Sequence, residues 1–478
     1  MSQLLYDPIV ILTASLFVVI GAITILRLGA FFSLILGALT VRLWSSFISG
    51  NEVNLTSDLT SVCEALGTTV GNVGLLIVLG TAIGKFMTDN GSADRIVLFF
   101  RNLFGAKRLP AALASGAFLL SIPVFYDATF YLLLPLAKSA YRATRSRYVC
   151  YLLAVGLGAT ISHTIIPPTP GPIAVATTLD VPISTALGIG VMVGACLFPV
   201  ALLLAWALDK IMPNPKIDPS ALQEESQDYS TAPDAPNVAT YPSLLASFAP
   251  ILLPAILIAV ASLTKSALSQ ADVSSRWLEW LQVLYFLGNV NVALFLGAVT
   301  AYLTTLFSRT RGATRSVMEQ KLNTILTGAG AIILITASGG AYGAMLRESG
   351  IGERISELFA LGDGSASLTV LTLAFFLTAL LKSAQGSSTT AMITSASIFA
   401  TLNLTSSTLH CSMGYLTAAI GSGSCVASWM NDSGFCVFSR STGISELDSL
   451  KVWTVGTGLL GFCGYFVILI LSRLVPLV

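Results

Sequence analysis

Charged residues are scarce in this chain. Asp, Glu, Lys and Arg make up 10% of its 478 residues and hydrophobic residues 54%, whereas soluble domains are about 25% charged. The net charge is only +1, which gives no basis for binding nucleic acid or a strongly acidic partner. The composition therefore excludes an ordinary soluble domain and predicts an all-α polytopic protein whose main partner is the lipid bilayer.

Histidines are few and the cysteines are not clustered. The chain has two histidines and seven scattered cysteines, with no CxxC pair. The spacing that metal ligands or a disulfide framework would need is missing, so we expect free thiols, no metal site and no cofactor. The opening MSQLLYD contains neither Lys nor Arg, so we expect no cleaved signal peptide.

Long apolar runs dominate what is present. A helix needs about 20 residues to cross a bilayer, and we predict ten spans, centred near residues 17, 39, 79, 160, 197, 253, 292, 335, 420 and 463. Two further stretches, about 110–137 and about 366–400, are interrupted midway by polar residues and are predicted to be re-entrant helical hairpins. The Pro-rich acidic segment 213–241 predicts a disordered cytoplasmic linker.

The chain contains a weak internal repeat. GTAIGKFMTDNGSADRI (80–96) aligns with GGAYGAMLRESGIGERI (339–355) at an offset of 259 residues, matching three glycines, an alanine, an arginine and an isoleucine. Each half then consists of three spans, a hairpin, a broken span and a last span. Because five crossings is an odd number, the second half must be inserted upside down, and inverted-topology repeats with broken helices are typical of secondary transporters.

The predicted repeats have these boundaries. The first covers residues 1–212, with its broken span at about 149–182, and the second covers 242–478, with its broken span at about 411–438. If the N-terminus is outside, most of the 25 Lys and Arg residues fall on the cytoplasmic side, as the positive-inside rule requires. Both termini are then exterior, and the two hairpins enter from opposite sides, the first from the cytoplasm.

The stretch SHTIIPPTPGP (162–172) places four prolines and a glycine inside a predicted span. Prolines remove backbone donors, so the span should break near Pro167 to Gly171. In lipid, irregular backbone is tolerated only where it is buried in protein or lines a wet cavity. The new helix N-terminus would favour an anion and the C-terminal carbonyls a cation. The alternative is a packing kink without a ligand.

The second break is SWMNDSGF (428–435), where Asn431, Asp432 and Ser433 offer amide, carboxylate and hydroxyl groups. Asp432 and Asp127 are the two acids that we place at membrane depth, where a charge is costly and therefore suggests function. Each is a candidate proton carrier or part of a cation site. The alternative for Asp127 is the N-cap of the second helix of its hairpin.

The second hairpin carries KSAQGSSTTA (382–391). Its turn and hydroxyls suit a small polyhydroxy or carboxylate ligand, although Ser and Thr also pack membrane helices. Lys382 has three alternatives: pairing with a substrate carboxylate, pairing with an Asp, or snorkelling to the outer surface, which we favour. His163 precedes the first break by one turn and is either a proton relay or a structural donor.

These motifs, together with GNVGLLIVLGTAIGKFMTDNGSADRI, IPVFYDATFYLLLPLA and AQGSSTTAMITSASI, resemble the gluconate permease family of proton symporters, within the wider ion transporter superfamily. The resemblance extends from about residue 70 to 440. It implies a homodimer of the cytoplasmic membrane, in which a domain of hairpins and broken helices moves against a scaffold. Carried over by motif, the binding site would use Asp127, His163, Thr164, Thr169, Gly171, Gln385, Gly386, Ser387, Ser388, Asn431, Asp432 and Ser433.

The function that the resemblance implies is import of gluconate or a related sugar acid by proton symport. One alternative is the same fold carrying di- or tricarboxylates or a hydroxy amino acid, with sodium as a second candidate coupling ion. A passive channel is another. An intramembrane hydrolase built from Ser162 or Ser433 with His163 and Asp432 is disfavoured, because an inverted repeat gives an enzyme no obvious benefit. We therefore predict a carrier and not an enzyme.

Overall fold

The computed structural model describes residues 8–48, 54–105, 108–144, 146–212, 241–269, 275–307, 315–350 and 366–477. Within these ranges the chain forms helices and no β-strand, which confirms the all-α prediction. Apart from Tyr241, the predicted linker 213–241 lies outside the described residues. So do the repeat-matched Arg354 and Ile355.

The helices occur in similar order in the two halves of the chain. The first half contains α2 (Pro8–Thr24), α3 (Ala30–Ile48), α4 (Leu55–Asp89), α5 (Ser92–Phe104), α6 (Leu109–Leu120), α7 (Tyr126–Thr144), α8 (Tyr148–Ile165), α9 (Pro170–Thr178) and α10 (Ile183–Ile211). The second contains α12 (Leu244–Ser269), α13 (Ser275–Leu287), α14 (Val290–Phe307), α15 (Arg315–Glu348), α17 (Ala366–Gln385), α18 (Ser388–Ala400), α19 (Ser406–Leu409), α20 (Met413–Gly423), α21 (Ser433–Thr442), α22 (Glu446–Ser449), η3 (Leu450–Thr454) and α23 (Val455–Leu474).

Nine segments of the described chain are long and apolar enough to cross a membrane, counting α8 with α9 as one. The prediction of ten spans differs at three places. The segment near residue 17 is the shorter helix α2, the segment near 420 is divided between α20 and α21, and α17 is long enough to span although it was predicted as a hairpin arm. The polytopic membrane class is confirmed, whereas re-entry of the hairpins into the bilayer stays a prediction.

The long helices α4 and α15 lie side by side and antiparallel. At one end, Arg42 of α3 lies 2.9 Å from Asp58 and 2.6 Å from Glu348, so the start of α4 meets the end of α15. At the other end, Lys321 Nζ lies 3.3 Å from Asp89 Oδ2, which joins the start of α15 to the end of α4. The repeat-matched segments 80–96 and 339–355 begin within these two helices, so the matched parts run in opposite directions.

Two matched glycines let α4 and α15 pack closely against the predicted hairpins, α6 with α7 and α17 with α18. A Cβ on Gly84 of α4 would lie 2.6 Å from the carbonyl oxygen of Pro123, in the loop between α6 and α7. A Cβ on its partner Gly343 of α15 would lie 2.6 Å from the Cβ of Ser397 in α18. Real Cβ atoms do not tolerate such distances, so each position requires glycine for packing.

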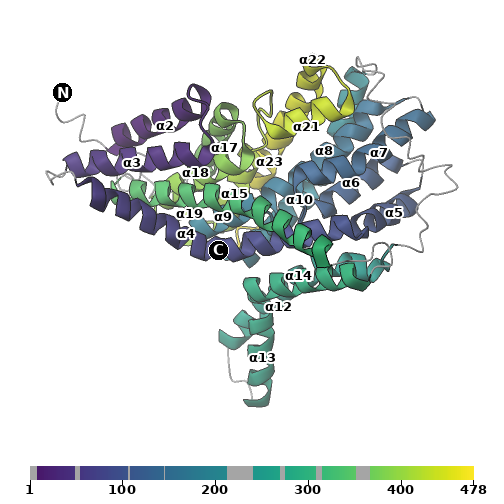
Figure 1. The fold of residues 1–478 in the computed structure, drawn as a ribbon, viewed down its shortest axis with the longest axis horizontal. Coiled ribbons are helices and arrows are strands. Elements are labelled where there is room, and N and C mark those ends of the chain that lie inside the picture. Colours follow the sequence, from purple (N-terminus) through teal and green to yellow (C-terminus); the bar gives the residue numbers. More distant parts are fainter. Residues whose placement is uncertain are drawn as a thin grey trace.

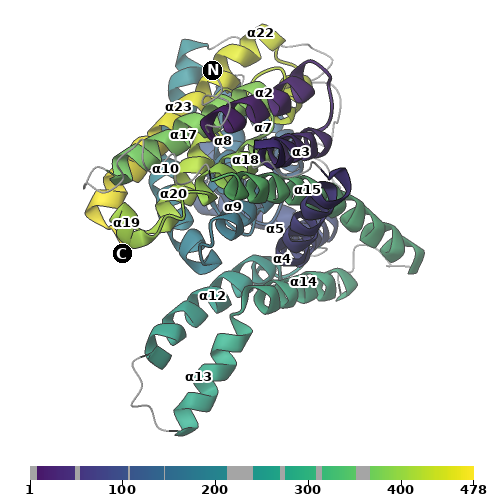
Figure 2. The same ribbon diagram turned by 90° about the vertical axis from the view of Figure 1, so that its left-hand side faces the viewer.

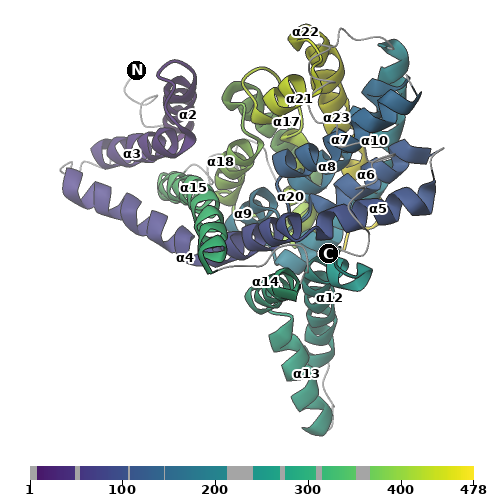
Figure 3. The same cartoon turned by 45° about the vertical axis from the view of Figure 1, so that its right-hand side comes forward.

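The broken helix α8–α9 and helix α20 lie in the interior of the molecule. Figure 3 shows α2, α3, α4 and α15 on one side of α9, α18 and α20, with α5, α6 and α7 on the other. Almost every residue of α8 and α9 is buried, as irregular backbone at membrane depth requires. By contrast, α12 and α13 project from the bundle (Figure 1 and Figure 2).

Candidate functional site

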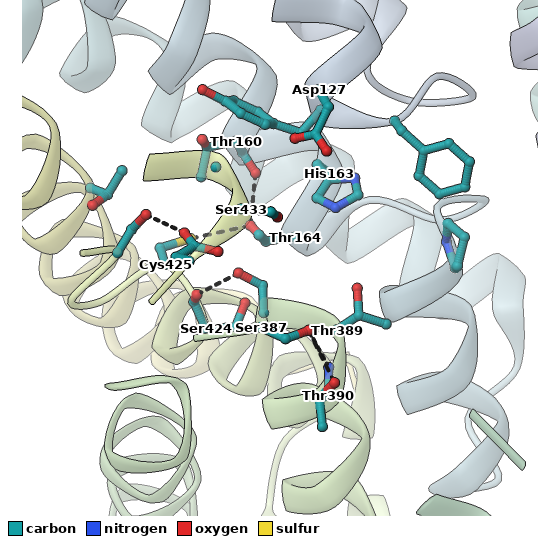
Figure 4. A pocket seen from close by; sticks show the side chains of 18 of the residues that line it. Asp127, Thr160, His163, Thr164, Ser387, Thr389, Thr390, Ser424, Cys425 and Ser433 are labelled. Carbon is teal, nitrogen blue, oxygen red and sulfur yellow. Dashed lines mark hydrogen bonds between the residues drawn. The ribbon is translucent and has the colours of Figure 1, made fainter. Parts of the chain in front are cut away.

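Four interruptions of helical structure meet around one cavity. They are the loops between α6 and α7, α8 and α9, α17 and α18, and α20 and α21, and the cavity has a volume of about 270 Å³. Figure 4 shows Asp127 and His163 on one side and Ser387, Ser424 and Thr390 on the other. The cavity is lined by Phe125, Tyr126, Asp127, Thr160, His163, Thr164, Pro170, Ile332, Ile335, Ser387, Ser388, Thr389, Thr390, Ser424, Cys425, Ser428, Asp432, Ser433, Gly434, Trp453 and Thr457.

Four helices begin at this cavity. The first turns of α7, α9, α18 and α21 contribute Tyr126, Pro170, Ser388 and Ser433 to its wall. The first N–H groups of a helix have no partner inside the helix, and the macrodipole adds a positive partial charge there. Four such ends bring positive partial charges to the cavity wall, where no described Lys or Arg contributes a side chain.

The Pro-rich break between α8 and α9 has few backbone N–H donors and packs closely against α18. α8 ends at Ile165 and α9 begins at Pro170, so the interruption covers residues 166–169 and lies slightly before the predicted position. Because Pro170 and Pro172 have no N–H, Gly171 supplies the free backbone donor of the first turn. A Cβ on Gly171 would lie 2.2 Å from the Met392 methyl group, which explains the glycine by its contact with α18.

The turn between α17 and α18 presses against the second break. Gly386 has φ +75°, and a Cβ there would lie 2.2 Å from the carbonyl oxygen of Asn431. The Asn431 Nδ2 donates to the carbonyl oxygen of Ser383 at 3.0 Å, and Ser388 Oγ donates to that of Ser424 at 2.9 Å. These contacts hold the hairpin tip on the 424–432 segment.

Lys382 does not snorkel to the surface, so the favoured prediction for its side chain is wrong. It is 1% exposed, its Nζ lies 2.8 Å from Asp432 Oδ1, and it donates to the carbonyl oxygen of Gly386 at 3.0 Å. A buried ammonium group needs a counter-charge, and the carboxylate is 50 residues away in sequence. The second alternative, pairing with an Asp, is therefore the one that the structure contains.

Asp127 is not a helix cap. α7 begins at Tyr126, which places Asp127 in the first turn and not at the N-cap, so the N-cap alternative is wrong. The carboxylate lines the cavity. The neighbouring Tyr126 hydroxyl and the His163 Nδ1 are both buried and have no hydrogen-bond partner among the described residues. Unpaired buried polar groups on a cavity wall suggest a missing ligand.

The predicted residues fall into two groups. Those that line the cavity are Asp127, His163, Thr164, Ser387, Ser388, Asp432 and Ser433. Those outside its wall are Thr169, Gly171, Gln385, Gly386 and Asn431, which shape the breaks behind it. Gln385 is 8% exposed, and neither of its side-chain polar atoms has a partner in the described chain.

Sequence reasoning missed several lining residues. Thr160 lies one turn before Thr164 on the same face of α8, so helical spacing could have indicated it. Tyr126 lies within the quoted motif IPVFYDATFYLLLPLA, and Cys425 lies three residues before SWMNDSGF. Trp453, which follows the second break by about twenty residues, carries no local signal, because tertiary packing alone brings it to the cavity.

The structure has all seven cysteines as free thiols, three of them buried. The described residues include no cluster of His, Cys, Asp or Glu that could hold a metal ion.

Comparison with known proteins identifies the family of the chain. Residues 7–475 match the family described as GntP family permease. The chain is 28% identical to the inner membrane permease YgbN of Escherichia coli, covering 92% of this chain and 93% of that protein. It is 28% identical to the Gnt-II system L-idonate transporter of Escherichia coli, covering 97% and 99%, and 26% identical to the gluconate permease of Bacillus subtilis, covering 98% and 100%.

A solved structure shares the fold. The YdaH transporter of Alcanivorax borkumensis superposes with a TM-score of 0.62 at 15% sequence identity, covering 88% of this chain and 90% of that one. The family match and the nine apolar helices make this a multi-pass integral protein of the inner membrane, as predicted. It is a permease and not an enzyme, and it belongs to the GntP permease family.

Proposed function

We propose that this permease is a secondary active transporter that imports gluconate or a related sugar acid together with protons. The observation that carries the proposal is the convergence of four helix N-termini on a cavity that is also rich in hydroxyl groups. The N-termini suit a carboxylate, and Ser and Thr hydroxyls suit the hydroxyl groups of a sugar acid. Relatives named as gluconate and L-idonate transporters support this substrate class.

The charges of the site favour a monocarboxylate over the alternative di- or tricarboxylate. No Lys or Arg of the described chain lines the cavity, whereas Asp127 and Asp432 do. The nearby cation, Lys382, is already paired with Asp432. Two or three substrate carboxylates would therefore lack counter-charges, while a single one can be held by helix N-termini. A hydroxy amino acid stays an alternative, since its ammonium group would suit Asp127.

Protons are the coupling ion that we propose. Sodium remains an alternative, because it needs several oxygen ligands and the broken helices offer carbonyl oxygens. The inverted repeats and the homodimer also belong to this proposal. The antiparallel course of α4 and α15 supports the inverted repeats. The resemblance to transporters with a moving domain supports the homodimer.

The test is uptake of labelled gluconate by the purified protein in liposomes under an imposed pH gradient. We expect accumulation above the external concentration, competition by other sugar acids, and no change when sodium is removed. Failure of every sugar acid to compete would reject the substrate class. Uptake that requires sodium would reject proton coupling, and uptake that never exceeds equilibrium would indicate a channel.

A further inference from the structure

The two acids of the cavity have different surroundings. Asp432 is 7% exposed and both of its carboxylate oxygens are occupied. Oδ1 pairs with Lys382 Nζ at 2.8 Å, and Oδ2 accepts the Ser428 hydroxyl, which in turn accepts Trp453 Nε1 at 2.7 Å. Every one of these contacts stabilises an ionised carboxylate.

Lys382 depends on its ion pair with Asp432. Its side chain is buried, and its second contact is the carbonyl oxygen of Gly386 at the hairpin turn. Removing the negative charge of Asp432 would leave a buried ammonium group without a counter-charge, which is strongly unfavourable. The pair therefore behaves as one neutral unit during binding.

Asp127 differs from Asp432 in having no such partners. It is partly exposed to the cavity from the first turn of α7, and no described residue forms an ion pair or hydrogen bond with its carboxylate. An ionised Asp127 would repel a substrate carboxylate in the same cavity. A protonated Asp127 would not, and it could donate a hydrogen bond to the substrate.

The other titratable groups near Asp127 come from several elements. They are Tyr126 on the same helix, His163 on α8, Cys425 and Asp432 on the segment between α20 and α21, and Lys382 on α17 behind Asp432. The adjacent helix α6 carries none in its sequence. Among these groups His163 is the competing proton acceptor, since its Nδ1 is buried without a partner.

We infer that Asp127 carries the coupling proton, that Lys382 holds Asp432 ionised, and that the sugar-acid anion binds after Asp127 is protonated. This inference deepens the proposed function and rests on it. Lys382 is then a positioning residue, because it acts on the substrate through Asp432.

A charge count follows from this assignment. Lys382 and Asp432 cancel each other, so the empty site carries the single negative charge of Asp127. With one proton and one monovalent anion bound, the site again carries one negative charge. Loaded and empty carriers then have equal charge, and transport of one proton with one anion is electroneutral.

The first experiment uses full-length protein in liposomes and labelled gluconate. Wild-type exchange should weaken by up to about tenfold per pH unit once Asp127 ionises. Asp127→Asn should exchange gluconate more slowly than the wild type, at a rate that no longer depends on pH, and should not accumulate it under a pH gradient, whereas Asp127→Glu should keep the gradient response. Exchange itself shows that the Asn variant is folded; if Asn abolishes exchange, the double variant and the membrane-potential measurement below decide.

A second set of variants tests which of the two acids, Asp127 or Asp432, carries the proton. Lys382→Met combined with Asp432→Asn removes the pair together, and we expect slower uptake that still responds to the pH gradient; His163→Gln should also respond. Wild-type accumulation should not respond to a membrane potential imposed without a pH gradient. Accumulation by Asp127→Asn under a pH gradient, loss of gradient response in the double variant that still exchanges, or potential-driven accumulation by the wild type would each overturn the inference.

The same assay distinguishes the two levels of the argument. A wild-type protein that exchanges gluconate at a rate independent of pH contradicts the Asp127 assignment and leaves sugar-acid transport standing. A wild-type protein that exchanges no sugar acid contradicts the proposed function and this inference with it.

Discussion

At the residue scale, the glycines of the breaks have separate physical reasons, and substitution distinguishes them. Gly386 combines φ +75° with a backbone oxygen 2.2 Å from the position of an added Cβ, whereas the obstacle at Gly171 is the flexible end of Met392. Gly350 has φ +74°, and among the described residues no atom beyond its chain neighbours lies within 4 Å of an added Cβ. Positive φ alone costs a non-glycine residue about 1–2 kcal/mol.

We therefore expect Gly386→Ala to abolish gluconate uptake and lower the melting temperature most. Gly350→Ala, the matched control, should show the conformational cost alone and keep uptake. Gly171→Ala should lie between the two, because the Met392 side chain can move. Thermal unfolding in detergent and liposome uptake measure both effects. Equal losses for Gly386→Ala and Gly350→Ala would mean that contact with Asn431 is unimportant.

At the same scale, sequence reasoning succeeded where chemistry is local and failed where it is not. Consecutive prolines and the NDSG run must interrupt a helix, so both breaks could be located within a few residues. Lys382 was misjudged because hydropathy describes a side chain with its neighbours in sequence, whereas its counter-charge comes from Asp432 on another element. Trp453 was missed for the same reason.

At the element scale, α4 packs at Gly84 against the loop that joins α6 to α7. An added Cβ on Gly84 would lie 2.6 Å from the carbonyl oxygen of Pro123, whereas one on Gly71 of the same helix would have no contact within 4 Å in the described part of the chain. We expect Gly84→Ala to displace the loop before Asp127 and to reduce uptake strongly. Gly71→Ala should be neutral or stabilising by up to about 1 kcal/mol, because alanine favours helix.

The comparison of these two variants uses uptake rate and thermal unfolding. A Gly84→Ala protein with the uptake and stability of Gly71→Ala would contradict the role of this contact.

The order of helices was predictable from apolar runs, but which runs cross the membrane was not. Helix α2 is shorter than a full span and α17 is as long as one, so the length of an apolar run alone does not distinguish a span from a hairpin arm.

At the scale of the whole molecule, the orientation depends on the distribution of basic residues. A reporter fused at Ser226, in the predicted linker and outside the described residues, should be active on the cytoplasmic side. An extracellular signal there would reverse the orientation of both hairpins. The antiparallel α4 and α15, tied at both ends by ion pairs, agree with the inverted repeats that the odd number of crossings predicts.

The central claim is that helix N-termini at the cavity hold the substrate carboxylate, and α21 offers a direct test. Ser433 is its first residue, where proline is tolerated while removing the N–H. The preceding Asp432 already has the extended backbone, φ −99° and ψ 136°, that a following proline requires. Ser433→Ala removes the hydroxyl and keeps the backbone donor, so it is the matched control.

The measurement is the affinity of the purified protein for gluconate by titration calorimetry. The account predicts that Ser433→Pro binds at least about tenfold more weakly than Ser433→Ala, since a hydrogen bond to a charged group contributes about 1.5–3 kcal/mol. Equal affinities of the two folded variants would contradict the claim that the N-terminus of α21 binds the anion.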